Sequence, residues 1–455
     1  MNLKRYIGDK QFYMTTIAII LPIVAQQLVT TSVNLIDNVM IGKLGSDALT
    51  AVTVANKIYF LYASVLFGFC GAASILIAQF YGSHNKYKCQ KIMDLNLIIP
   101  VICAVLFIVA MIIAPRYFLG FFSTEKAVLE LAEQYAKYAI WTYIPYGIVF
   151  ASLSALRSIG ITKVQMYIGI LSVAINTTLN YILIFGKFGF PVLGVEGAAI
   201  ATLIARIVEM LIYFYLLLSK RYLFTICFKD LFKIDFQLFK QMFKSAIPLT
   251  INEILFSLGM SLVFISYVRC DESLMAAVSV VDTVKQIMFI LFGGLSTAIS
   301  ILIGNRLGAN QIEEAKSNAD KLLVFGFLIS IVVSMVFILI APLIASLYNV
   351  EDVIKEMIII LIRIKSCALP FYVFNICIYF ILRAGGDTFN TMIMDSGALW
   401  LGSVLVSTVL SVFFDIPLLL LYIIVEFCDV IKSFVAIYFY KLDKWAKNMT
   451  LENGG

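Results

Sequence analysis

Long apolar runs alternate with short polar connections along the whole chain. A run of about 20 apolar residues is long enough to cross the hydrocarbon core of a bilayer as a helix. The pattern predicts twelve such spans, near residues 13–41, 52–80, 92–114, 136–156, 164–186, 194–219, 242–267, 273–304, 317–341, 356–382, 389–414 and 417–440. It therefore predicts an all-α polytopic membrane protein in which no separate soluble domain carries the function.

Composition agrees with this class. Of 455 residues, 62% are hydrophobic and only 14% are charged, and the mean hydropathy is +0.97. Soluble domains contain about 25% charged residues. The first apolar run follows MNLKRYIGDK and resembles a signal peptide. It is too long and lacks a small-residue cleavage site, so we interpret it as the first span.

The distribution of basic residues predicts the orientation. With the N-terminus inside, the inner segments hold 21 of the 34 lysines and arginines. Basic residues collect on the cytoplasmic side of membrane proteins, so both termini are expected there. The net charge of +6 follows from this bias and does not indicate nucleic-acid binding. The Lys-, Ile- and Phe-rich composition with short termini favours a bacterial inner membrane.

The first half of the chain matches the second half at one constant offset in residue number, and this offset is the spacing between Pro22 and Pro248. The matches keep this register from the first span to the sixth: Gly68 with Gly294, Leu156-Arg157 with Leu382-Arg383, and Arg206 with Lys432. Each half holds six spans, so both halves insert in the same orientation, related by an axis along the membrane normal. We expect an N-terminal lobe (1–219), a cytoplasmic linker (220–244) and a C-terminal lobe with a short tail (245–455).

The eight cysteines are scattered, and none forms a CxxC pair: Cys70, Cys89, Cys103, Cys227, Cys270, Cys367, Cys377 and Cys428. We interpret them as small apolar residues and expect neither a disulfide framework nor a cysteine metal site.

Asp37 lies within the first span, in 21-LPIVAQQLVTTSVNLIDNVMIGKLG-45. A carboxylate at the centre of a bilayer costs roughly 2.5–3.5 kcal/mol or more, and such residues mark functional sites. From the rise of a helix, Asp37 lies about 8 Å below the outer surface.

Three neutral polar residues fall at a similar depth. Asn176 and Asn180 are four residues apart in the fifth span and share one helix face. They lie about 15 and 9 Å from its outer end, and Thr202 lies about 12 Å from the outer end of the sixth span. With Asp37 they form a candidate site for a hard cation, or for a proton on the carboxylate. The alternative for each amide or hydroxyl is an interhelical hydrogen bond.

A second buried acid, Glu253, lies about ten residues into the seventh span, where the first half has Gln27. We interpret it as a site for a cationic substrate or a proton. The alternative is a carboxyl kept neutral by its apolar surroundings and one hydrogen bond.

For the other charged residues in the spans we expect mainly structural roles. Asp282 and Lys285 are three residues apart, so we expect a local ion pair, with gating or substrate contact as the alternative. Asp395 lies near the inner end of its span and is expected to reach water. Arg206 lies near Glu209, and Lys432 lies near Glu426 or Asp429; for both cations we expect structural pairing with these acids or snorkelling to the membrane surface.

Five stretches resemble motifs of the multidrug and toxic compound extrusion (MATE) transporters. They are 31-TSVNLIDNVMIGKLGSDALTAV-52, 67-FGFCGAASILIAQFYG-82, 153-LSALRSIGITK-163, 176-NTTLNYILIFGKFGFPVLGVEGAAIAT-202 and 294-GLSTAISILIGNRLGA-309. The resemblance covers nearly the whole chain. It implies export of cationic, often aromatic compounds in exchange for sodium ions or protons, without a cofactor, and we expect a monomer.

The resemblance extends to single residues. Asp37, Asn176 and Thr202 match the N-lobe cation site of the family, and Asn180 matches a position that is Asn in NorM-like members and Asp in DinF-like ones. The chain is thus similar to the NorM-like side. The implied coupling ion at Asp37 is Na+ or H+.

In the C-terminal half, Glu253 matches the seventh-helix glutamate of NorM-like members. Their tenth-helix aspartate aligns with Tyr372, with Asn375 nearby, so Glu253 remains as the one acid of that pair. Glu253, Tyr372 and Asn375 form the candidate substrate or second coupling site.

Other functions remain as alternatives. A flippase for lipid-linked oligosaccharide precursors shares this superfold, but it needs an arginine-rich cavity for pyrophosphate. The few cations that we place within the spans, Arg206, Lys432 and Lys285, argue against it. The sequence shows no catalytic constellation or paired-histidine metal motif, so an intramembrane enzyme is not expected. A receptor fits poorly with a two-lobe repeat that implies alternating access.

Overall fold

The computed structural model describes residues 6–219, 223–224, 233–348 and 350–451. All regular secondary structure in this part of the chain is helical, and it contains no β-strand. Its helices are α1 (Lys10–Gly42), α2 (Ser46–Gly82), α3 (Lys86–Ile113), α4 (Pro115–Gly120), α5 (Lys126–Ala139), η2 (Ile140–Thr142), α6 (Tyr143–Ser158), α7 (Lys163–Phe185), α8 (Gly194–Leu218), α10 (Phe236–Cys270), η3 (Glu272–Leu274), α11 (Met275–Gly308), α12 (Ile312–Ser346), α13 (Asp352–Ala384), α14 (Thr388–Met392), η4 (Ile393–Gly397), η5 (Trp400–Val404), α15 (Leu405–Phe413) and α16 (Leu418–Lys441).

Each predicted span corresponds to a helix or to a continuous helical segment, which confirms the all-α polytopic fold. Within the described residues, eleven segments are long and apolar enough to cross a membrane. The twelfth predicted span corresponds to α16, which carries Glu426, Asp429 and Lys432 in its middle. The fourth span begins earlier than predicted, at Lys126, because the amphipathic sequence KAVLELAEQYAKYA extends the helix beyond its apolar part.

The chain divides into two compact units. The N-unit comprises Ala25–Thr250, and the C-unit comprises the described residues of Met1–Val24 and Ile251–Gly455. Both boundaries lie inside helices: the first part of α1 packs with the C-unit, and the first part of α10 packs with the N-unit. Of the expected linker 220–244, residues 220–222 and 225–232 lie outside the described part of the chain, and residues 236–244 belong to α10.

The helix boundaries carry the same repeat as the sequence. The segment Ser46–Gly82 corresponds end to end with Glu272–Gly308, and Lys126–Ser158 corresponds with Asp352–Ala384. The unit boundaries, after Val24 and after Thr250, are separated by the same offset as Pro22 and Pro248. The repeat predicted from the sequence is therefore confirmed as a repeat of structure.

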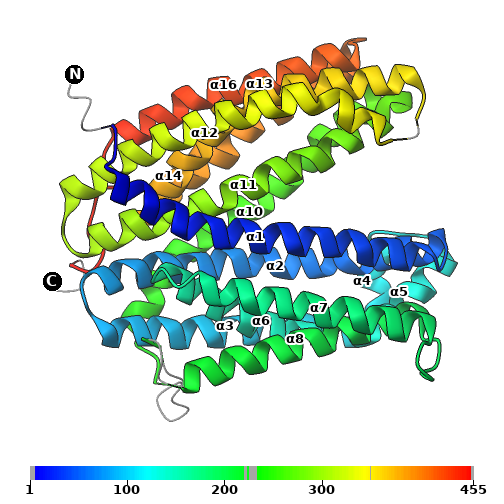
Figure 1. Ribbon diagram of the computed structural model, residues 1–455, viewed down its shortest axis with the longest axis horizontal. Helices are drawn as coiled ribbons and strands as arrows, with labels where there is room; N and C mark the ends of the chain where they lie inside the picture. Colours follow the sequence, from blue (N-terminus) through cyan, green and yellow to red (C-terminus); the bar gives the residue numbers. More distant parts are fainter. Residues whose placement is uncertain (1–5, 220–222, 225–232, 349, 452–455) are drawn as a thin grey trace. The chain divides into compact units, whose positions relative to one another are not determined.

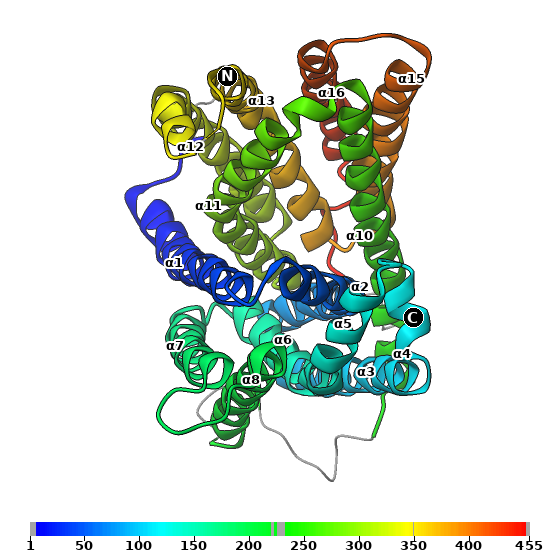
Figure 2. The same cartoon turned by 90° about the vertical axis from the view of Figure 1, so that its right-hand side faces the viewer.

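In the N-unit, α2, α3, α6, α7 and α8 form a bundle that is seen nearly end-on in Figure 2. The fully buried Tyr62 ties three of these helices together. Its hydroxyl lies 2.9 Å from the backbone oxygen of Tyr143 and 3.2 Å from that of Pro100, and its ring stacks on Tyr143 with 5.1 Å between centroids.

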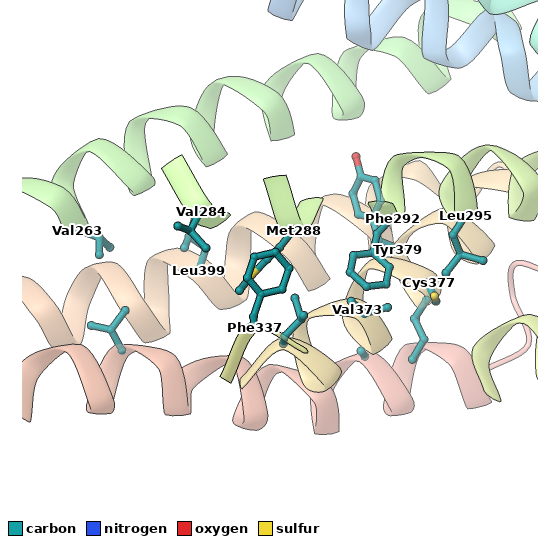
Figure 3. Close-up of a cluster of buried hydrophobic side chains, with 14 of the residues drawn as sticks. Val263, Val284, Met288, Phe292, Leu295, Phe337, Val373, Cys377, Tyr379 and Leu399 are labelled. Carbon is teal, nitrogen blue, oxygen red and sulfur yellow. The ribbon is translucent and has the colours of Figure 1, made fainter. Parts of the chain in front are cut away.

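The core of the C-unit is built from α10, α11, α12, α13 and α16 (Figure 1). Figure 3 shows Met288, Phe292, Phe337, Val373 and neighbouring side chains packed together, with the Tyr379 hydroxyl pointing away from them. That hydroxyl lies within hydrogen-bonding distance of Glu253 and Arg383 of the same unit. The packing of the Tyr379 ring in the core therefore fixes the position of its hydroxyl.

Two repeat-related glycines allow the exchanged helix segments to approach closely. In the N-unit, a Cβ atom at Gly68 of α2 would lie 2.8 Å from the Cα of Thr250 in α10. In the C-unit, a Cβ atom at Gly294 of α11 would lie 2.9 Å from the backbone oxygen of Ile20 in α1. Helices in membranes pack closest where small residues face each other, and here each glycine faces a helix backbone.

We predict that Gly68→Ala destabilises the protein by about 1–3 kcal/mol, because the added methyl group must displace the α10 backbone. Denaturant unfolding in detergent measures the change. Gly42→Ala is the control, since a Cβ atom there has nothing within 4 Å. Equal stability of the two variants would contradict the proposed close packing.

Candidate functional site

The four candidate residues of the N-unit meet at one place. Asp37 extends from α1, Asn176 and Asn180 lie one turn apart on α7, and Thr202 lies on α8. The α7–α8 pair packs along its length, which places the asparagines opposite Thr202. The structure thus brings together residues from the first, fifth and sixth predicted spans.

Hydrogen bonds join these four side chains into one chain. The amide nitrogen of Asn180 donates to Asp37 Oδ1 at 2.8 Å and approaches Asn176 Oδ1 at 3.4 Å. The amide nitrogen of Asn176 donates to Thr202 Oγ1 at 3.2 Å. The Thr202 hydroxyl in turn donates to the backbone oxygen of Ala198 at 3.0 Å. Each amide and hydroxyl of the set is therefore used as a donor, and acceptor oxygens remain available for a ligand.

One of these oxygens has no partner within the described structure. Asn180 is 1% exposed, and its Oδ1 atom is buried without a hydrogen bond. A buried acceptor without a donor costs about 1–3 kcal/mol. With the Asp37 carboxylate, Asn176 Oδ1 and Thr202 Oγ1, it makes a set of oxygen atoms of the kind that hard cations bind.

Glu253 belongs to a separate network in the C-unit. The Tyr379 hydroxyl lies 3.4 Å from Glu253 Oε1 and also 3.4 Å from a guanidinium nitrogen of Arg383. The neighbouring Asn252 donates to Asp395 Oδ2 at 3.0 Å. Among the described residues, no hydrogen bond joins Glu253 to Tyr372 or Asn375, the two residues predicted to accompany it.

Asp395 does not simply reach water, as the sequence had suggested. It lies in the π-helical segment η4, and its Oδ1 atom forms an ion pair with Lys432 Nζ at 2.5 Å. Lys432 is therefore paired, as expected, but its partner is Asp395 and not the nearby Glu426 or Asp429. The sequence does not show which residues of the eleventh span lie beside which residues of α16. In the structure, Asp395 of η4 lies opposite Lys432 of α16. The predicted pair of Arg206 with Glu209 is confirmed, with 2.7 Å between NH1 and Oε2.

Glu426 pairs instead with Lys365 of α13. Lys365 Nζ lies 3.0 Å from Glu426 Oε1 and 2.7 Å from Oε2, and the two side chains are 5% and 10% exposed. Sequence reasoning missed Lys365. A lysine in the middle of the span 356–382, together with the acids of α16, was the available indication of a buried charged cluster.

This ion pair lines a cavity of about 610 Å³ that lies within the C-unit. Its charged lining residues are Asp282, Lys285, Lys365, Glu426, Asp429 and Lys432. Tyr372 also lines it, with its ring stacked on Phe289 at 4.3 Å between centroids. Asn375 lies nearby and donates to the backbone oxygen of Asp429 at 2.9 Å.

Asp282 and Lys285 line the same cavity, but the described structure shows no ion pair between them. Lys285 Nζ lies instead over the Phe289 ring, 5.6 Å from its centroid. Lys365 adds a buried cation that was not counted among the cations of the spans in the sequence analysis. Their count alone therefore does not argue against an anionic ligand.

The family model described as MatE matches residues 22–182 and 248–409, so its two segments begin at Pro22 and Pro248, which the repeat pairs. Similar proteins include the probable multidrug resistance protein YoeA of Bacillus subtilis, 29% identical over 301 residues or 65% of each chain. The probable multidrug resistance protein NorM of Thermotoga maritima is 22% identical over 96% of this chain and 93% of that one.

Solved structures share the fold. An outward-facing multidrug resistance MATE family transporter of the MOP superfamily matches with a TM-score of 0.88 and 20% identity, over 97% of this chain and 98% of that one. A MOP superfamily transporter from Pyrococcus furiosus, described as having a binding pocket of reverse polarity, matches with a TM-score of 0.87 and 19% identity over 98% of each chain.

We predict that Glu426→Gln destabilises the protein by about 3–5 kcal/mol, because it leaves the buried Lys365 ammonium without its carboxylate. The double variant Lys365→Met/Glu426→Met should recover most of this loss, since it removes both charges and fills the space. Denaturant unfolding in detergent gives the values.

The matched control is Glu133→Gln, which breaks the exposed pair of Glu133 with Arg116. Exposed ion pairs contribute little to stability, so this variant should unfold like wild type. A Glu426→Gln protein as stable as Glu133→Gln would show that the Lys365–Glu426 pair is solvated rather than buried.

Proposed function

The chain belongs to the MatE family, and from this premise we propose that it is a secondary active antiporter that exports cationic and aromatic organic compounds in exchange for Na+ or H+. The names of its relatives support drug-like substrates, since YoeA and NorM are named as multidrug resistance proteins. The proposal places the chain in a bacterial inner membrane as a monomer with both termini in the cytoplasm, working without a cofactor.

The hydrogen-bonded set of Asp37, Asn176, Asn180 and Thr202 is the observation on which the proposal depends. It contains one carboxylate and three neutral oxygens within the N-unit. A proton needs only the carboxylate, whereas a sodium ion would also use the unpaired Asn180 oxygen. The geometry therefore favours Na+ over H+ as the coupling ion.

Coupling follows from differential affinity. In the proposed cycle, an ion at Asp37 stabilises one conformation of the transporter and an organic substrate stabilises another. The free-energy difference between these affinities links the downhill ion movement to uphill export. Glu253, held by Tyr379, is proposed as a second group for a proton or a cationic substrate.

The flippase remains the second candidate. The lysines of the C-unit cavity favour an anion, but three carboxylates line the same cavity. A pyrophosphate carries several negative charges, so it requires an excess of cationic side chains. The balanced lining therefore favours the antiporter.

We predict that proteoliposomes loaded with ethidium export the dye when an inward sodium gradient is imposed, and that Asp37→Asn lowers the initial rate at least tenfold. The asparagine keeps the size of the side chain but removes the charge that holds the cation. Ethidium fluorescence measures the rate, and an inward proton gradient is tested separately.

Asp47→Asn is the matched control, because Asp47 is an exposed acid in the first turn of α2. It should transport like wild type. Unchanged sodium-driven export by Asp37→Asn would remove Asp37 as the coupling site. A wild-type protein that exports ethidium under neither gradient would favour the flippase.

A further inference from the structure

A smaller pocket of the C-unit, of about 480 Å³, lies where α1 and α12 begin and α11 ends. All of its lining residues belong to the C-unit, and none of them lines the larger cavity. Two of its four charged residues neutralise each other, since Arg306 NH1 lies 3.0 Å from Glu314 Oε2. The other two charged residues are Asp9 and Lys321.

Asp9 and Lys321 have no ionic partner within the described part of the chain. The Lys321 ammonium forms neither a hydrogen bond nor an ion pair with the described residues, and it lies 5.3 Å from the centroid of the Phe12 ring. Asp9 Oδ1 accepts a hydrogen bond from the backbone nitrogen of Phe12 at 2.8 Å and so caps the start of α1. One positive and one negative group are thus left in the same pocket, both next to Phe12.

The repeat shows that the fold does not require a polar pocket at this place. At the repeat offset, the N-unit has Phe80 and Leu95 where the C-unit has Arg306 and Lys321. Both apolar side chains are buried, with 1% and 2% exposed. The N-unit therefore fills with core side chains the positions at which the C-unit presents two cations to a pocket.

The two unpaired groups lie at different depths in the membrane. The helices α1 and α12 are the first and ninth spans, so both begin at the same membrane face. Lys321 lies inside the predicted start of its span at residue 317, and Asp9 lies outside the predicted start of the first span at residue 13, each by about 6 Å of helical rise. A lysine near the membrane surface extends its ammonium toward the lipid headgroups. The cation is therefore the deeper group, and the carboxylate is the outer one.

We propose that this pocket binds a phosphoethanolamine group, the headgroup of a zwitterionic membrane lipid. In such a lipid the phosphate adjoins the hydrocarbon and the ammonium lies farther out, which is the order of Lys321 and Asp9. The phosphate pairs with Lys321, and the ammonium donates hydrogen bonds to the carboxylate of Asp9.

Other common headgroups satisfy only one of the two charges. Phosphatidylglycerol has the phosphate but brings no cation to Asp9. Phosphatidylcholine has a cation, but its methylated nitrogen has no N–H group to donate. Each of these lipids therefore loses one charged hydrogen bond that phosphatidylethanolamine makes.

The inference goes beyond the proposed function, because it concerns a bound lipid and not a transported compound. Its test measures binding in detergent, which needs no ion gradient. The delipidated protein is titrated with phosphatidylethanolamine, phosphatidylglycerol or phosphatidylcholine of identical acyl chains, and native mass spectrometry gives the dissociation constant of the first lipid bound. Soluble O-phosphoethanolamine is added as a competitor, to distinguish a lipid from a free compound as the source of the group.

Wild type should bind phosphatidylethanolamine about tenfold more tightly than the other two lipids, the usual effect of one charged hydrogen bond. Asp9→Asn should weaken phosphatidylethanolamine binding about tenfold and leave phosphatidylglycerol binding unchanged, because asparagine caps a helix as well as aspartate but carries no charge. The unchanged phosphatidylglycerol binding also shows that this variant is folded. Lys321→Leu, which introduces the residue type of Leu95, should weaken both lipids about tenfold, since both use the phosphate contact.

Asp235→Asn is the matched control. Asp235 is the repeat counterpart of Asp9 and caps α10, with its Oδ1 atom 3.0 Å from the backbone nitrogen of Gln237. This variant should bind all three lipids like wild type.

Equal affinity of wild type for the three lipids would overturn the inference, as would equal lipid binding by Asp9→Asn and Asp235→Asn. Displacement of the lipid by an equal concentration of O-phosphoethanolamine would overturn the lipid as the source of the group. A protein that prefers phosphatidylethanolamine but does not export ethidium would support this pocket and contradict only the proposed antiport.

Discussion

A polar group within a membrane helix must find its partner inside the protein, and this requirement organises both units. In the N-unit, the carboxylate of Asp37 is held by Asn180, and the remaining amide and hydroxyl groups continue the chain to the backbone of α8. In the C-unit, Lys365 and Lys432 each take a carboxylate from another segment. The helices are thus tied together by the groups that are most costly to leave unpaired.

The two repeats place their polar and charged residues at different positions. Two polar residues of the N-unit cluster correspond to apolar residues in the C-unit: Asp37 corresponds to Val263, and Asn180 corresponds to Val406. Five of the six charged residues of the C-unit cavity in turn correspond to neutral residues in the N-unit, and the sixth, Lys432, corresponds to Arg206. The hydrogen-bonded cluster around Asp37 thus lies in one half, and the cavity lined by lysines and carboxylates lies in the other.

Much of the fold follows from sequence because apolar length and a constant repeat offset are properties of the chain itself. The grouping of Asp37, Asn176, Asn180 and Thr202 was also predictable, since helical rise gives each residue a depth. The depth of a residue does not give the direction in which its side chain points from the helix. For that reason the partner of Lys432 was predicted wrongly, and the pairing of Lys365 with the distant Glu426 was missed.

The exchange of the first parts of α1 and α10 between the units has a consequence for biogenesis. The chain up to Val24 emerges from the ribosome first, yet the rest of the unit it packs with begins at Ile251. The N-unit, in turn, is completed only when the chain has been synthesised as far as Thr250, with Phe243 reaching Phe69 at 5.0 Å between ring centroids. The N-unit is one continuous stretch and can be completed once Thr250 has been made, whereas the C-unit needs both ends of the chain. A gene split at the linker would therefore yield an N-terminal fragment that lacks the part of α10 belonging to its own unit.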